Sequence, residues 1–373
     1  MDPISIAVVS TASIAKGKVI PALNAVASTT IVGVSSRNKD RAAVFATENN
    51  AGKGMSHEEL LDDETVEAVY VPLPSGVRNA FMKTAIEKGK HVYSEKPHSG
   101  TVSELKAILA LARQKGVQFI DGTMWYHSNR TKIMEERLKS MGEVSRVSAS
   151  FSWGNGLVDQ EWIDGGNGRT DPSREPFGFL GDSGHYAISA VLWAFGWNLP
   201  VKVQAMHTKL NKLGAIITCE AFMWFPNGGR AIIDCSCESP HRSQFEVVCD
   251  KGVLKVDDLV GGQGRSGNFG AYMGPFVGSS SFIVGDEMGK DTVVDVEPCD
   301  HVQSLVTEFS NCVARIRDMG EKPEEKWGSI ALKTHTIMCA IFESAKRDGS
   351  LVTLRSDGKF GIGEEVVDDI PTF

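Results

Sequence analysis

Short apolar runs alternate with helix-like stretches through the first third of the chain. Residues 4–9 form a buried-strand pattern, a turn of small residues follows, and a helix-like stretch ending near residue 27 leads to a second strand at 31–34. The alternation continues to a strand-like run at 117–120. Six strands alternating with helices imply a parallel, doubly wound sheet, in which ligands bind in the crevice beyond the strand ends.

The first turn is a candidate phosphate-binding turn. Ser10, Ala12 and Ala15 stand at the three glycine positions of the G-x-G-x-x-G dinucleotide fingerprint. All three residues are small, so the backbone can still approach a phosphate at the helix N-terminus, and the hydroxyls of Ser10, Thr11 and Ser13 could donate. A structural turn that binds no ligand would explain this pattern about as well.

The end of the second strand indicates which nucleotide the domain would prefer. NAD-binding domains usually place Asp or Glu there, whereas this chain has Ser36 and Arg37. A hydroxyl and a guanidinium suit a 2′-phosphate, which favours NADP over NAD. The alternative is a loop arginine that contributes only to solubility.

A lysine follows another strand of this pattern. The run 91–93 ends in Ser94-Glu95-Lys96-Pro97-His98, which places Lys96 at the ligand-binding edge of a parallel sheet. Pro97 restricts Lys96 to extended conformations, and the Lys96–Pro97 bond could be cis or trans. Lys96 is therefore a candidate active-site ammonium; the alternative is a surface lysine before an ordinary proline.

The pattern changes after residue 123. Strand-like runs now follow one another through short turns from residue 144 to 296, and two helices, at 300–319 and 325–347, close the chain. Consecutive strands with short links predict an antiparallel sheet. We therefore expect a nucleotide-binding domain at 1–123 and an α+β domain with a large open sheet at 124–373. The glycine-rich stretch 261–280 is interpreted as a surface excursion.

One helix-like stretch, 181–196, carries a polar cluster within this second part. Asp182, His185 and Tyr186 stand at i, i+3 and i+4, a spacing that brings side chains near one face of a helix. They are candidate catalytic residues. The alternative is that Asp182 is a helix N-terminal carboxylate and Tyr186 a half-buried aromatic.

Composition excludes several classes of function. The formal net charge of −8 argues against a nucleic acid or an anionic membrane as the main partner, and no apolar run reaches the roughly 20 residues of a membrane span. The N-terminus shows no signal-peptide pattern, so we expect a cytoplasmic protein. Seven cysteines without a Cys-x-x-Cys pair suggest reduced thiols and no metal site.

Several separated motifs together resemble the glucose-fructose oxidoreductase/inositol dehydrogenase (Gfo/Idh/MocA) family, and the resemblance covers nearly the whole chain. The Asp-x-x-x-Tyr pattern is similar to its dihydrodiol and NADP-dependent xylose dehydrogenase branch. The motifs that carry the resemblance are Ser10-Thr11-Ala12-x-Ile14-Ala15, residues 19–22, residues 89–97, and Arg169-x-Asp171-Pro172 with residues 181–186.

The resemblance implies roles for individual residues. Lys96 would be the catalytic lysine, Tyr186 the general acid/base and Asp182 a partner of the lysine or of a substrate hydroxyl. Trp125 resembles a substrate-pocket aromatic, and we place Arg169, Asp182 and His185 with it as substrate-binding residues. The residues expected to bind the cofactor are Ser10, Thr11, Ala12, Ile14, Ser36, Arg37, Pro72, Leu73, Pro74, Glu95 and Lys96.

The expected function is therefore an NADP(H)-dependent oxidoreductase acting on an aldose, a polyol or a trans-dihydrodiol. Such proteins commonly pair through the open sheet, so we expect a homo-oligomer, a dimer or a tetramer. Two departures from the family leave the substrate open: His127 replaces a common arginine, and the glycine run before Asp182 is reduced. In addition, Arg78 replaces the usual histidine. The alternatives are a non-catalytic NADP-binding regulatory protein and a metal-dependent hydrolase using Asp182 and His185.

Overall fold

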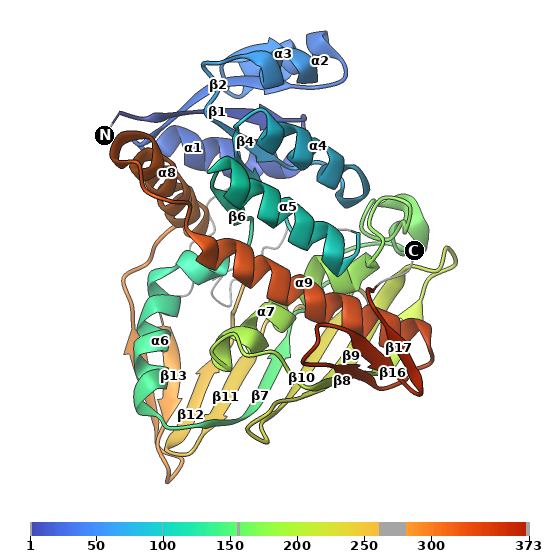
Figure 1. Ribbon diagram of the computed structural model, residues 1–373. Coiled ribbons are helices and arrows are strands. Elements are labelled where there is room, and N and C mark those ends of the chain that lie inside the picture. The colour runs from blue at the N-terminus through green and yellow to red at the C-terminus, as the bar shows by residue number, and fades with distance from the viewer. Residues whose placement is uncertain (1, 99, 155–156, 261–280, 371–373) are drawn as a thin grey trace.

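The computed structural model describes residues 2–98, 100–154, 157–260 and 281–370. Figure 1 shows two sheets, an upper one built from the N-terminal third and a lower one built from the rest of the chain. The glycine-rich stretch 261–280, interpreted above as a surface excursion, lies outside the described residues.

The upper sheet is parallel and has the order β3-β2-β1-β4-β5-β6. This order confirms the doubly wound sheet and places its topological switch between β1 and β4, where such sheets bind nucleotides. The strand β3 is only three residues long and was not predicted. The strands are β1 (Ile4–Val9), β2 (Thr29–Ser35), β3 (Lys53–Met55), β4 (Ala68–Val71), β5 (His91–Ser94) and β6 (Phe119–Asp121).

Helices connect these strands and cover both faces of the sheet. Thr101 and Glu104 form the predicted capping box at the start of α5, and Gly116 ends that helix in the left-handed conformation. The helical elements are η1 (Ala15–Val19), α1 (Ile20–Ala25), α2 (Lys39–Glu48), α3 (His57–Asp62), α4 (Ser75–Glu87) and α5 (Val102–Lys115).

The lower sheet contains eleven described strands in the order β14-β13-β12-β11-β7-β10-β9-β8-β15-β16-β17. All neighbours are antiparallel except β7 and β10, which confirms the mostly antiparallel prediction. The last three strands are short and were not predicted. The strands are β7 (Val144–Ser150), β8 (Lys202–Leu210), β9 (Ile216–Trp224), β10 (Arg230–Ser236), β11 (Phe245–Cys249), β12 (Gly252–Val256), β13 (Ser281–Gly285), β14 (Asp291–Asp295), β15 (Val352–Leu354), β16 (Phe360–Ile362) and β17 (Glu365–Val367).

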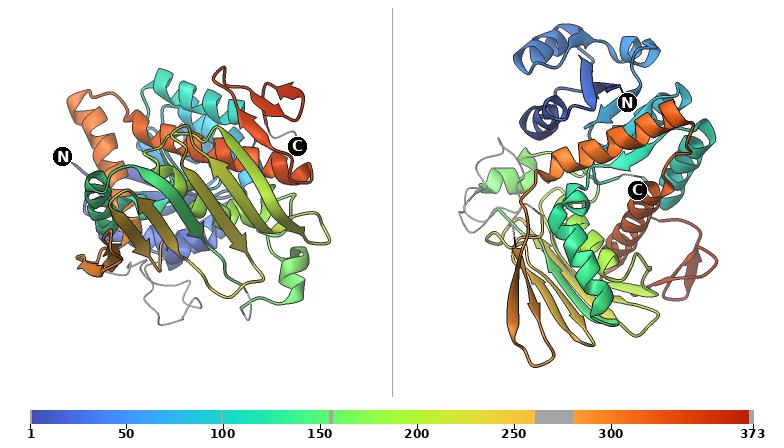
Figure 2. Two further views of the ribbon diagram at one scale, coloured as in Figure 1. Left: turned by 90° about the horizontal axis from the view of Figure 1, so that it is seen from below. Right: turned by 90° about the vertical axis from the view of Figure 1, so that its left-hand side faces the viewer.

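Helices cover one face of the lower sheet, and among the described residues no helix covers the opposite face (Figure 2). The helix α7 is buried along its whole length, and α9 contacts α5 and β6 of the upper layer as well as α7 and β8 below. These helical elements are η2 (Met124–His127), α6 (Asn129–Ser140), η3 (Trp162–Gly166), η4 (Leu180–Gly184), α7 (His185–Ala194), α8 (His301–Met319) and α9 (Glu325–Lys346). No helix in the described part of the chain is long and apolar enough to cross a membrane.

Candidate active site

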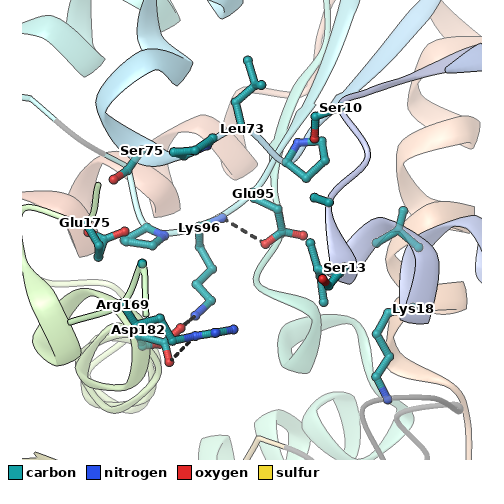
Figure 3. A pocket seen from close by; sticks show the side chains of 18 of the residues that line it. Ser10, Ser13, Lys18, Leu73, Ser75, Glu95, Lys96, Arg169, Glu175 and Asp182 are labelled. Atoms are coloured by element: carbon teal, nitrogen blue, oxygen red, sulfur yellow. Dashed lines mark hydrogen bonds and ion pairs between the residues drawn. The ribbon is translucent and has the colours of Figure 1, made fainter. Parts of the chain in front are cut away.

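A cavity of about 700 Å³ runs from the turn after β1 to the start of η4. The small-residue turn lies at one end of the cavity, and Lys96, Arg169 and Asp182 lie together at the other end (Figure 3). Tyr186 also lines the cavity. Every residue that the sequence analysis expected to bind the cofactor lines this cavity: Ser10, Thr11, Ala12, Ile14, Ser36, Arg37, Pro72, Leu73, Pro74, Glu95 and Lys96.

The turn after β1 has an unusual backbone conformation. Ser10, at the first glycine position, has a φ of 91°, which a residue with a side chain adopts only under constraint. Its amide donates to the Ser35 carbonyl of β2 at 2.7 Å, which holds the turn against the neighbouring strand. The helix that follows begins at Ser13 and continues to the end of α1 at Ala25, so its N-terminal end faces the turn and suits an anionic group of a ligand.

Two arginines line the cavity where β2 ends. Arg37 follows β2, and Arg41 lies in the first turn of α2, which Asn38 caps by accepting from the Arg41 amide at 2.9 Å. Sequence reasoning found Arg37 but missed Arg41, although the spacing of four residues around a helix N-cap was a usable signal. A pair of exposed guanidiniums next to the Ser36 hydroxyl fits a 2′-phosphate.

Lys96 extends from the end of β5 across the cavity (Figure 3). The Lys96–Pro97 peptide is cis. The Lys96 ammonium donates to the backbone carbonyl of Asp182 at 2.6 Å and to its carboxylate Oδ1 at 3.2 Å. The ammonium also lies over the Tyr186 ring, 4.5 Å from the ring centre. The structure thus brings together the three residues predicted to be catalytic.

Asp182 is ionised at this position. Burial alone would raise the pKa of its carboxyl, but the charges of Lys96 and Arg169 outweigh that effect and hold the pKa at about 2. The Arg169 guanidinium lies 3.1 Å from Oδ2 of Asp182 and 6.0 Å from the Trp153 ring centre. The Asp182 carboxylate therefore orients two cations at one end of the cavity.

Asp182, His185 and Tyr186 do not share one face as the helical spacing predicted. Asp182 lies in η4, a π-helical turn, and the α-helix α7 begins only at His185. A π turn has more residues per turn than an α-helix, so the residue three positions after Asp182 is rotated away from it. Tyr186 lines the cavity, whereas His185 is 1% exposed and its Nε2 lies 2.8 Å from Thr123 Oγ1.

Trp125 is also buried away from the cavity. Its side chain is fully buried, and its indole Nε1 donates to Ser189 Oγ of α7 at 3.1 Å. Neither Trp125 nor His185 lines the cavity, so the prediction that they contact substrate finds no support in their positions. Both side chains face the interior between η2 and α7, because aromatic and imidazole groups with local hydrogen-bond partners can be buried there.

Other cavity-lining residues were not predicted. Glu175 is 9% exposed, its Oε1 has no hydrogen-bond partner among the described residues, and burial raises the pKa of its carboxyl to about 7. Trp153 donates from Nε1 to Ser183 Oγ at 3.1 Å. Arg78 was noted in the sequence only as a departure from the usual histidine. Nothing in the local sequence marks Glu175 or Trp153, because tertiary packing alone brings them to the cavity.

Two family models match separate parts of the chain. Residues 4–123 match the oxidoreductase family with an NAD-binding Rossmann fold, and residues 137–255 match the GFO/IDH/MocA C-terminal domain. The chain belongs to the GFO/IDH/MocA family of oxidoreductases. In the described residues no group of three or more His, Cys, Asp or Glu side chains is placed to hold a metal ion.

Several relatives of the chain are named as sugar or diol oxidoreductases. A dTDP-3,4-didehydro-2,6-dideoxy-alpha-D-glucose 3-reductase from Streptomyces antibioticus is 29% identical over 67% of this chain and 74% of its own length. A D-xylose 1-dehydrogenase (NADP(+)) from Haloferax volcanii is 28% identical, with the same coverage of both chains. A trans-1,2-dihydrobenzene-1,2-diol dehydrogenase from Sus scrofa is 26% identical over 61% of this chain and 66% of its own length.

Solved structures share the fold. KijD10, a 3-ketoreductase from Actinomadura kijaniata solved with NADP and TDP-benzene, superposes with a TM-score of 0.74 at 22% identity, covering 91% of this chain and 97% of that one. The aldose-aldose oxidoreductase from Caulobacter crescentus, complexed with glycerol, has a TM-score of 0.78 at 19% identity, covering 94% of this chain and all of that one. At these identities the similarity establishes the two-sheet architecture.

Proposed function

We propose that the protein is an NADP(H)-dependent oxidoreductase that interconverts a hydroxyl and a carbonyl group on a small polyhydroxylated substrate. The observation that carries the proposal is the convergence of Lys96, Asp182 and Tyr186 at one end of a cavity whose other end is a dinucleotide-type turn. The relatives named as sugar reductases and sugar or diol dehydrogenases support this substrate class.

The cavity fits NADP along its length. The turn at Ser10 and the helix N-terminus after it suit the pyrophosphate, and Arg37 with Arg41 suits the 2′-phosphate. The strand ends at Pro72–Pro74 and Glu95 line the part of the cavity between the turn and Lys96. The nicotinamide, when bound, accepts or supplies the hydride.

The residues of this chain then have to move one proton and stabilise a developing alkoxide. In the oxidative direction the Tyr186 phenolate takes the proton of the substrate hydroxyl, and in the reductive direction the phenol returns a proton to the new alkoxide. The Lys96 ammonium favours the phenolate by its positive charge. Asp182 holds Lys96 and Arg169 in place and can accept a hydrogen bond from a substrate hydroxyl.

An NADP-coupled absorbance screen tests the proposal. Aldoses, polyols, trans-dihydrodiols and dTDP-linked keto sugars are offered with NADP or NADPH, and turnover on one of these classes is the expected result. Lys96→Met is the matched negative control. Tight NADP binding without turnover on any class would instead support a non-catalytic NADP-binding regulatory protein.

A further inference from the structure

The Arg78 guanidinium lies beneath the segment that carries Lys96. Arg78 is in the first turn of α4 and is only 4% exposed. Its Nε and Nη2 donate to the Leu73 carbonyl at 2.9 and 2.6 Å. Its Nη1 donates to the Pro97 carbonyl at 2.6 Å and also to the Glu95 carbonyl. One side chain therefore bonds to the segments that follow two neighbouring strands, β4 and β5.

The two carbonyls from the second of these segments belong to Glu95 and Pro97, the residues on either side of Lys96. Fixing both carbonyls fixes the direction in which the Lys96 side chain leaves the backbone. That side chain must reach across to Asp182, where its ammonium is 2.6 Å from the backbone carbonyl. We propose that Arg78 is a positioning residue that orients Lys96 toward Asp182 and Tyr186 by holding the backbone on both sides of the lysine.

The chemistry of arginine suits this role. A guanidinium presents five N–H donors in a rigid plane, whereas a lysine has a single rotating ammonium and a histidine at most two N–H groups. Burial lowers the pKa of Arg78, and the nearby charges of Glu95 and Glu175 oppose that effect. A buried cation is costly unless it is fully hydrogen-bonded, and here backbone carbonyls supply most of that bonding.

This inference rests on the proposed function, so its test separates the two. Arg78→Gln, Lys96→Met and the double variant are compared by kcat, by the NADP dissociation constant and by the pH dependence of oxidation. The pH profile of oxidation depends on the ionisation of Tyr186 and of the titratable and charged groups that surround it and Lys96. Besides Asp182 and Arg169, these are Tyr93, Glu95, Asp121, Glu175 and His185.

Lys96→Met should lower kcat, and the residual oxidation should need a higher pH than in the wild type, because the Tyr186 phenolate loses its stabilising ammonium. Arg78→Gln should cause a smaller change in the same direction, with about a 10- to 100-fold loss of kcat, because an atomic misplacement of about 1 Å costs this much. The NADP dissociation constant should change by less than about threefold. The double variant should be little worse than Lys96→Met, because both substitutions disable the same group.

Lys90→Met is the matched control. Lys90 is a second buried cation of the upper sheet that donates to backbone carbonyls, those of Asp63 and Val66, but it lies at the opposite end of β5. The Lys90→Met substitution should lower the melting temperature without changing the pH dependence of oxidation. The inference would be overturned if Arg78→Gln, like Lys90→Met, lowered the melting temperature without changing the pH profile. It would also be overturned if the losses of kcat in Arg78→Gln and Lys96→Met multiplied in the double variant.

A crystal structure of Arg78→Lys gives a readout that does not depend on turnover. This substitution retains the charge and so tests the inference if Arg78→Gln does not fold. The Lys96 ammonium should move out of hydrogen-bond distance of Asp182. An unmoved ammonium would disprove the positioning role, whereas wild-type turnover in Lys96→Met would disprove the proposed function instead.

Discussion

The Lys96 ammonium lies over the Tyr186 ring, 4.5 Å from its centre, while it donates to Asp182. A cation against an aromatic face in a partly desolvated site is stabilised by about 0.5–2 kcal/mol. The Tyr186 hydroxyl meanwhile lies 3.7 Å from Met124 Sδ, a weak acceptor. The lysine and the phenol ring are thus in contact, and the positive charge lies close to the group that would exchange the proton.

Tyr186→Phe should reduce turnover by about 10²–10⁴-fold with cofactor binding largely preserved, because the variant retains the ring but lacks the ionisable oxygen. Steady-state rates with the best substrate from the screen measure this effect. The Tyr186→Phe/Lys96→Met double variant should be little worse than the worse single variant, since both residues serve one step.

His185→Gln is the internal control for that experiment. Its ring is buried against Thr123 outside the cavity, so we expect a loss of stability and little change in the pH dependence of turnover. Near wild-type rates in Tyr186→Phe would show that Tyr186 does not transfer the proton. A collapse of turnover in His185→Gln alone would assign the proton transfer to His185 instead.

Arg37→Ala should weaken NADP far more than NAD. A charge-assisted contact contributes about 1.5–3 kcal/mol, or roughly 10- to 150-fold in affinity. Arg41→Ala should have the same selectivity, because Arg41 lines the same end of the cavity. Titration of each variant with both cofactors is the measurement, and Arg355→Ala, an exposed arginine after β15, is the control. Equal losses for NADP and NAD would show that neither arginine reads the phosphate.

Glu175→Gln should stabilise the fold increasingly as the pH rises. Burial raises the pKa of this carboxyl from its ordinary value of 4.5 to about 7 in the folded protein, so the unfolded chain releases its proton at lower pH. The contribution of this carboxyl to the free energy of unfolding therefore falls as the pH rises from 4.5 to 7. The fall is up to about 3 kcal/mol, at about 1.4 kcal/mol per pKa unit. The amide variant has no ionisable group here and avoids this loss.

Melting temperatures of wild type and Glu175→Gln at pH 4.5, 6 and 8 measure the effect. The difference should be near zero at pH 4.5 and largest at pH 8. Glu58→Gln, on the exposed surface of α3, controls for the removal of one charge. A difference that is independent of pH would show that the Glu175 carboxyl is ionised in the folded protein.

The uncovered face of the lower sheet should form a contact between copies of the chain. Phe222 and Trp224 of β9 alternate with buried neighbours and lie with ring centres 4.9 Å apart, so a partner would remove an aromatic pair from water. Light scattering at micromolar concentration should show a homo-oligomer, and Trp224→Glu should dissociate it. Met319→Glu, at the end of α8, should not. A wild-type monomer would contradict this prediction.

Local sequence determined most of the architecture. The alternation over the first 120 residues predicted the parallel sheet, the consecutive strands after residue 144 predicted the antiparallel one, and Lys96 could be placed at a strand end. These features depend on side-chain periodicity and on turn residues that act over a few positions. The short strands β3 and β15 to β17 were not predicted. Strands β3, β16 and β17 lie in no apolar run like the one at 117–120 that indicated β6, and the apolar run at 351–354 that contains β15 was missed.

Tertiary structure decided which candidate side chains meet. The π turn η4 separated His185 from Asp182 and Tyr186, although ideal helical spacing would have kept the three together. Long-range packing brought Glu175 to the cavity and placed Arg78 under the backbone around Lys96. Such contacts join segments that are distant in sequence, and their geometry depends on how the two sheets and their helices pack, which no local pattern records.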